Sequence, residues 1–188
     1  MRAPLLTACL ALPLVLVPVP GRGDLYDEYR AMNRAERRLV LRYFWQALPV
    51  REAAEEARLR SERAFPALSG QDDPRDAFRH ALWNGFMTRR LESRESAERW
   101  GTAHESDPAN PPARRAMDLW NNEQGRERTW AAGTHRRTWL GTRSALPDDD
   151  AVERLLRDAL RTGGLRELEL VNGARDPQAG ALVPTFVP

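Results

Sequence analysis

The sequence has 188 residues, enough for one domain with a hydrophobic core. Hydrophobic residues make up 41% and charged residues 30%, a balance typical of a globular, soluble protein. All 29 basic residues are arginines, and they face 27 acidic residues. Without Arg2 and Arg22, which lie in the N-terminal segment, 27 basic residues remain, so the rest of the chain is near neutral. This balance argues against a nucleic-acid-binding protein.

The N-terminal segment MRAPLLTACLALPLVLVPVP has an early arginine followed by an apolar run, as in a secretory signal. The run contains prolines and is short for a stable membrane span. We therefore expect residues 1–23 to be a signal peptide, with export to the periplasm or the extracellular space and no membrane span after its removal. The alternative is a retained N-terminal anchor or lipidation within LTAC, the segment that ends at Cys9. Because Cys9 is the only cysteine, its removal would exclude disulfides and thiol catalysis.

Helix signals fill the next part of the chain. Asn33, with Glu36 three residues later, is a variant of the capping box and predicts a helix that Pro49 ends. A second helix is expected in the Ala-, Glu- and Arg-rich segment that follows, up to Pro66. Asp73 as N-cap with proline next predicts the start of a third.

The second half of the chain continues this pattern. A fourth helix is expected from Ser93, and the loop DPANPP separates it from a fifth, which ends near Gly125 or Gly133. The segment DDDAVERLLRDALRTGG has an acidic start and a Gly-Gly end, typical of one more helix.

Together these signals predict a mostly α protein. We expect a single compact helical domain over residues 24–164, with about five to six helices and with the candidate site in residues 76–126. The segment 165–188 is expected to be a C-terminal tail, irregular or β-like. Apolar and polar residues alternate from Leu165 to Val171, which suggests a short strand there.

Polar side chains recur on the apolar faces of three predicted helices. On a helical wheel Asp76 and His80 share a face with Trp83 and Met87, so the two polar groups are expected to point inward. The next two helices repeat the pattern. The further inward polar residues are His104 and Glu105, then Asp118, Asn121 and Asn122.

Two interpretations compete for this set. The first is a buried hydrogen-bond network that fixes the register of the helices. The second is a hydrolytic site that uses acid–base chemistry or a divalent metal, because imidazole and carboxylate together suit Zn²⁺ or a similar ion. The candidate catalytic residues are His80, His104, Glu105 and Asp118, and the candidate metal ligands are His80, His104 and Asp118. Either Glu105 or His104 would be the general base, the histidine with its tautomer held by a carboxylate. The sequence contains no zinc signature such as HExxH.

Candidate substrate-binding residues flank these groups. Arg79 and Arg126 could clamp an anionic group, or could pair instead with Asp118, Glu105 or Asp76. The amides of Asn121 and Asn122 are the other candidates. His135 is expected to be an exposed loop histidine, and no serine has the context of a nucleophile elbow.

Three sequence blocks in order resemble a bacterial domain family of unknown function. They are DAFRHALWNGFMT, AHE and MDLWNNEQGR, and they span Asp76 to Arg126. The positions that match the family pattern are Arg79, His80, Trp83, His104, Glu105, Asp118, Asn121, Asn122, Gly125 and Arg126. Trp120 stands where many members have histidine, so any role of that histidine is absent or displaced here. The resemblance implies one assembled polar site and names no reaction.

The sequence therefore leaves two main functional hypotheses. One is an exported hydrolase that acts on an envelope component or a macromolecular substrate, with a divalent metal as candidate cofactor. The other is a non-enzymatic envelope or secreted binding module in which the polar network is structural. Nucleic acid is not an expected partner, and a cleft lined by the polar residues would distinguish the first hypothesis from the second.

Overall fold

The computed structural model describes residues 29–139 and 141–185, so the predicted signal peptide lies outside the described residues. The contacts divide the chain into residues 1–31 and a second unit, Met32–Pro188, to which the elements named below belong. The described part of this unit confirms the predicted mostly α fold class. Its helices are α2 (Arg34–Arg42), α3 (Phe44–Ala64), α4 (Pro74–Leu91), α5 (Arg94–His104), α6 (Pro112–Ala131) and α7 (Asp149–Arg161).

Several helix starts follow the predicted caps. The Asn33 side chain accepts hydrogen bonds from the first turn of α2, and the Glu36 carboxylate accepts one from the Asn33 backbone N–H, which completes the capping box. Asp73 caps α4 as predicted, and Ser93, from which the fourth helix was expected, caps α5. These local bonds pair backbone N–H groups that a helix start otherwise leaves without partners.

The predicted end of the first helix at Pro49 is wrong. The chain breaks at Tyr43, whose dihedral angles (φ −130°, ψ 46°) separate α2 from α3, and Pro49 lies in the second turn of α3. Proline removes only one backbone hydrogen bond there, close to the N-terminal end of a long helix. The burial of Val50, Ala53 and Ala57 on the same helix stabilises the continued α3 against that loss.

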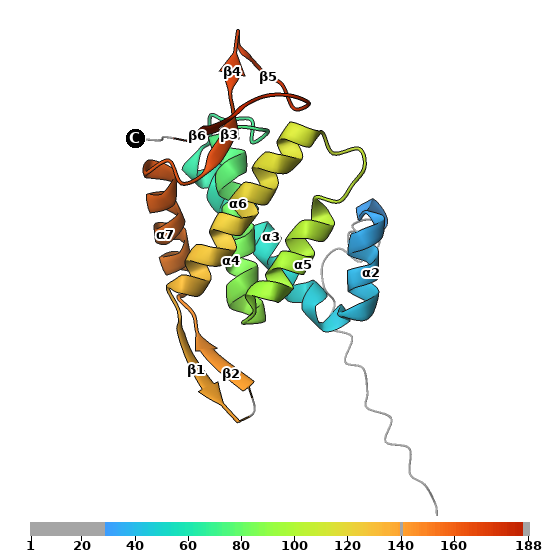
Figure 1. Cartoon of the computed structure of the whole chain (residues 1–188), viewed down its shortest axis with the longest axis vertical. Helices are drawn as coiled ribbons and strands as arrows, with labels where there is room; N and C mark the ends of the chain where they lie inside the picture. The colour runs from blue at the N-terminus through green and yellow to red at the C-terminus, as the bar shows by residue number, and fades with distance from the viewer. Residues whose placement is uncertain (1–28, 140, 186–188) are drawn as a thin grey trace, which may run out of the picture. The chain divides into compact units, whose positions relative to one another are not determined.

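Helix α4 is the central element of the unit and contacts α3, α5, α6 and α7 (Figure 1). Its side chains of Phe78, Leu82 and Phe86 are fully buried. Helix α6 approaches α4 closely at Gly125, where a Cβ atom would lie 2.1 Å from the Ala81 carbonyl oxygen. Only glycine allows that approach, which brings the polar residues of α6 against those of α4.

Short antiparallel pairs of strands complete the described structure. β3 (Arg166–Leu168) pairs with β6 (Leu182–Pro184), and β4 (Leu170–Val171) pairs with β5 (Ala174–Arg175), in line with the predicted β-like tail. A hairpin of β1 (Thr134–Thr138) and β2 (Gly141–Ala145) lies between α6 and α7, where the sequence predicted a connection without strands inside the helical domain. His135 is exposed as expected but belongs to β1 and not to a loop. Within the described residues, no helix has the length and apolar character needed to cross a membrane.

Candidate functional site

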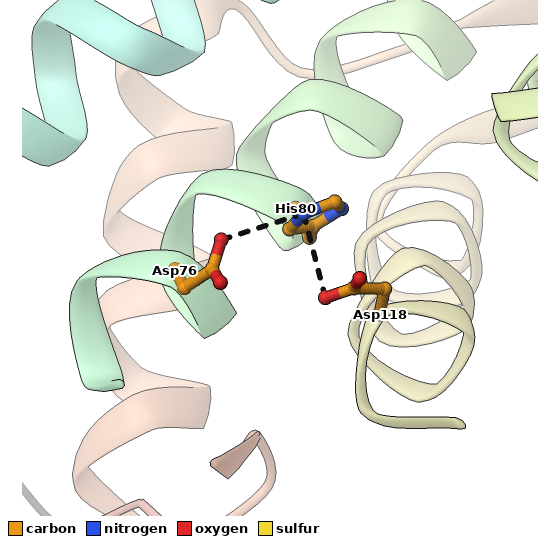
Figure 2. A group of neighbouring side chains, drawn as sticks. All are labelled: Asp76, His80 and Asp118. Atoms are coloured by element: carbon orange, nitrogen blue, oxygen red, sulfur yellow. Dashed lines mark ion pairs between the residues drawn. The ribbon is translucent and has the colours of Figure 1, made fainter. Parts of the chain in front are cut away.

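Helices α4 and α6 bring three ionisable side chains together. Asp76 and His80 lie one turn apart on α4, and Asp118 reaches them from α6. Figure 2 shows the two carboxylates converging on the imidazole. All three side chains are buried. Asp76 is held in place by the Asp72 backbone N–H, which donates to its second oxygen at 2.7 Å.

The spacing of these groups suits a shared cation. The His80 Nε2 atom lies 3.4 Å from one oxygen of Asp76 and 3.4 Å from Oδ1 of Asp118. One ligand atom from each residue lies within 4.8 Å of the others. The Oδ1 atom of Asp118 is buried and accepts no hydrogen bond from the described residues. A buried carboxylate oxygen without such a bond is costly, so it requires a proton or a cation nearby.

The opposite ring nitrogen of His80 meets the other predicted residues. Its Nδ1 atom lies 3.3 Å from the Asn122 amide oxygen and 3.5 Å from Oε1 of Glu105. The Asn122 amide nitrogen donates to the same Glu105 oxygen at 3.3 Å, and Asn110 donates to the other at 3.0 Å. Glu105 is only 2% exposed, and both of its oxygens have partners. This side of the imidazole is therefore packed and hydrogen-bonded.

Burial and charge shift the pKa values in the cluster in different directions. Burial lowers the pKa of His80, but the carboxylates of Asp118 and Asp76 outweigh it and raise that pKa to about 9. Burial raises the pKa of Asp76, but His80 and Arg79 lower it to about 2. Burial raises the pKa of Asp118 to about 7, with opposition from His80 and reinforcement from Glu105 and Asp76. The carboxylates around His80 carry more negative charge than one imidazolium can neutralise. The cluster therefore favours binding of a further proton or a cation.

His104 lies outside the group that could share one ion. Its Nδ1 atom is 2.8 Å from a Glu36 oxygen on α2, and its side chain is 49% exposed. A carboxylate only accepts hydrogen bonds, so Nδ1 carries the proton and Nε2 has the free lone pair in the neutral ring. Burial raises the pKa of Glu36, but the bond and charge of His104 outweigh it and leave that pKa below its usual value. The His104 ring centroid lies 6.4 Å from that of His80.

A cleft of about 600 Å³ connects these groups. Loop residues such as Gly70 and Asn110 also line it. Arg79, whose side chain is 40% exposed, pairs with Asp76 and also lies 3.3 Å from His80 Nε2. The site residues that line the cleft are Asp76, Arg79, His80, His104, Glu105 and Asp118.

Of the four predicted substrate-binding residues only Arg79 lines the cleft; Asn122 is fully buried beside His80 and Glu105, and the other two have different partners. Asn121 bonds to the backbone N–H and carbonyl of Arg166, which ties α6 to β3. Arg126 is buried and donates to the Asn84 amide oxygen at 3.2 Å, and burial lowers its pKa. Neither residue lines the cleft described above.

Sequence reasoning missed several members of the site. Asp76 was expected to point inward but was assigned no role, although its i,i+4 spacing to His80 offered a signal. Glu36 was explained by the capping box, and nothing local indicates its contact with a histidine 68 residues away. Asp72, which binds the Arg114 guanidinium through both oxygens at 2.7 and 2.6 Å, has a positive φ of 60° that is not predictable from sequence.

The fold and the site together define a helical domain with a buried Asp-His-Asp cluster that opens into a cleft. The chain belongs to the family described as domain of unknown function DUF6973, whose model matches residues 37–144. The match contains all three sequence blocks that carried the resemblance and reaches from α2 through most of β2. No curated protein and no solved structure matches the sequence.

Proposed function

We propose that the cleft is a hydrolytic active site that binds one divalent cation through Asp76, His80 and Asp118. The observation that carries the proposal is the buried Oδ1 atom of Asp118, a residue that lines the cleft. This oxygen faces a ring nitrogen and accepts no hydrogen bond from the described residues. Three protein ligands leave coordination positions open for water and substrate, as in catalytic metal sites. One imidazole with two carboxylates suits Zn²⁺ or Mn²⁺.

His104 is the better general base of the two candidates. Glu105 is nearly fully buried and has both oxygens occupied, whereas His104 is half exposed in the cleft and is oriented by Glu36. In the proposed reaction Nε2 of His104 takes a proton from water as the water oxygen attacks the electrophilic atom of the substrate. The same nitrogen then returns the proton to the leaving group. Arg79 is placed to hold an anionic part of the substrate, and Asn122 positions His80 and Glu105.

The test separates cation binding from hydrolysis. Purified, chelator-treated protein is titrated calorimetrically with Zn²⁺ or Mn²⁺ and is then assayed on a panel of chromogenic esters, phosphoesters and peptides. We expect His80→Asn to abolish cation binding, and His104→Gln to keep it while lowering the rate by roughly 10²–10⁴-fold. His135→Asn, on the exposed β1 strand, is the matched control and should leave both unchanged. Wild-type protein that binds neither ion and hydrolyses no substrate of the panel would overturn the proposal.

A non-enzymatic binding module is the second candidate. Its support is the continuous set of buried hydrogen bonds in which Asn122 joins Asn84, His80 and Glu105. If the network only maintains the fold, His80→Asn should lower the melting temperature while the wild-type protein shows no cation-dependent turnover.

We also propose that the protein is exported and acts on an envelope component or another macromolecule outside the cytoplasm. The support is the signal-like sequence of residues 1–23. Alkaline phosphatase fused after the full chain should be active in a bacterial host and inactive when residues 2–23 are deleted. Activity that is unchanged by the deletion would contradict export through this segment.

A further inference from the structure

Exposed apolar side chains cluster where α2 meets α3. Leu41, Phe44, Trp45 and Leu48 are 74%, 72%, 59% and 58% exposed, and we call these four residues the apolar corner. The preceding Leu39 and Val40 pack against the core. Helix α2 is therefore docked on the domain, and Leu41 is exposed because it lies on the outer face of this helix. Apolar side chains grouped in this way usually mark a binding surface.

The aromatic residues of the apolar corner contact each other. The Trp45 and Phe44 rings lie edge to face at 5.3 Å between centroids, and Trp45 meets Tyr43 in the same way at 5.7 Å. Tyr43 itself packs partly against the core. These ring contacts already restrict the exposed aromatic side chains in the free protein. The side chains therefore lose little conformational freedom on binding.

Arginines flank the apolar corner along the sequence, and the exposed Glu52 is the first acid after them. The segment Arg37–Arg51 contains four arginines and no acidic residue. Arg37 and Arg38 are exposed, and neither pairs with an acid among the described residues. The nearest acid before them, Glu36, is bound to His104. The surface therefore presents apolar and aromatic side chains bordered by cationic ones.

This combination fits an anionic lipid surface. Aromatic and aliphatic side chains next to arginines are typical of helices that lie in a membrane interface, where apolar groups enter the acyl boundary and cations meet lipid phosphates. Each arginine near an anionic surface strengthens the binding. We propose that the apolar corner docks the domain on an anionic membrane, with Phe44 and Trp45 inserted and Arg37, Arg38 and Arg42 against phosphates. This inference goes beyond the proposed hydrolytic function and does not depend on it.

A local probe tests this docking in the full chain. A fluorophore sensitive to polarity is attached at Leu48→Cys in a Cys9→Ser background, so that the label reports the apolar corner and not the N-terminal segment. We expect a blue shift on addition of vesicles that contain phosphatidylglycerol, and none with phosphatidylcholine alone. The matched control is Leu170→Cys, on β4 and 56% exposed, which should show no shift.

Two sets of substitutions complete the test. Arg37→Glu with Arg38→Glu should weaken vesicle binding roughly tenfold or more, because two attractive charges become repulsive. Phe44→Ser with Trp45→Ser should abolish the shift, with circular dichroism as the check on folding. Equal shifts at Leu48 and Leu170, equal binding to both lipids, or a shift that depends on protein concentration without vesicles would overturn the proposal. The last result would assign the apolar corner to a second copy of the chain.

Discussion

The carboxyl group of Asp118 has the least complete set of hydrogen bonds in the site. Burial raises its pKa to about 7, so in the absence of a cation it holds its proton up to nearly neutral pH. Its Oδ1 atom makes no hydrogen bond with the described residues and faces His80 at 3.4 Å. The Asp118 side chain therefore lowers the stability of the metal-free protein. A role as ligand to a cation would explain why aspartate is present at this position.

We expect Asp118→Asn to stabilise the metal-free protein at high pH. A carboxyl whose pKa is raised on folding contributes stability that is complete below about 3.8 and is lost as the pH rises through about 7. The amide cannot ionise, so the variant should match wild type near pH 4 and exceed it at pH 8 by about 1–3 kcal/mol in free energy of unfolding. Urea unfolding with chelator present measures this difference. A variant that is less stable than wild type at pH 8 would contradict the burial argument.

At the scale of elements, α2 connects the N-terminal part of the unit to the cleft. The Asn33 side chain caps α2 and also donates to the carbonyls of Ala103 and His104 at 2.7 and 3.1 Å. Glu36, one turn further along, binds the His104 ring. The position of the proposed general base therefore depends on the docking of α2 against α5.

Asn33→Ala should destabilise the protein by about 1–2 kcal/mol, because it removes a helix cap and both bonds to α5. Ser93→Ala is the matched control, since it removes the cap of α5 without touching His104. Only Asn33→Ala should also change the His104 side-chain resonances in NMR spectra. Equal changes in the two variants would mean that α2 does not position the ring.

Some features of these elements could be predicted from the sequence and others could not. The caps at Asn33 and Asp73 are local patterns, and they predicted where α2 and α4 begin. The i,i+4 face of Asp76 and His80 likewise depends only on helix geometry. By contrast, the contact of Glu36 with His104 depends on tertiary packing, and the β1–β2 hairpin has no alternating apolar pattern to predict it.

At the scale of the whole folded unit, the cleft exists because α4, α5 and α6 converge on His80. The close approach at Gly125 fixes α6 against α4, and the end of α5 supplies Glu105 and His104. The apolar corner lies on α2, which also positions His104, and on the neighbouring helix α3. The proposed catalytic and membrane-binding surfaces thus share α2 as a structural support.

The most direct test of the account is anomalous diffraction from crystals grown with Mn²⁺ or Zn²⁺. The account predicts one anomalous peak about 2.0–2.2 Å from the ligand atoms of Asp76, His80 and Asp118, and none in crystals of Asp118→Asn. A cleft without such a peak at saturating ion, or a peak that persists in Asp118→Asn, would contradict the proposed metal site.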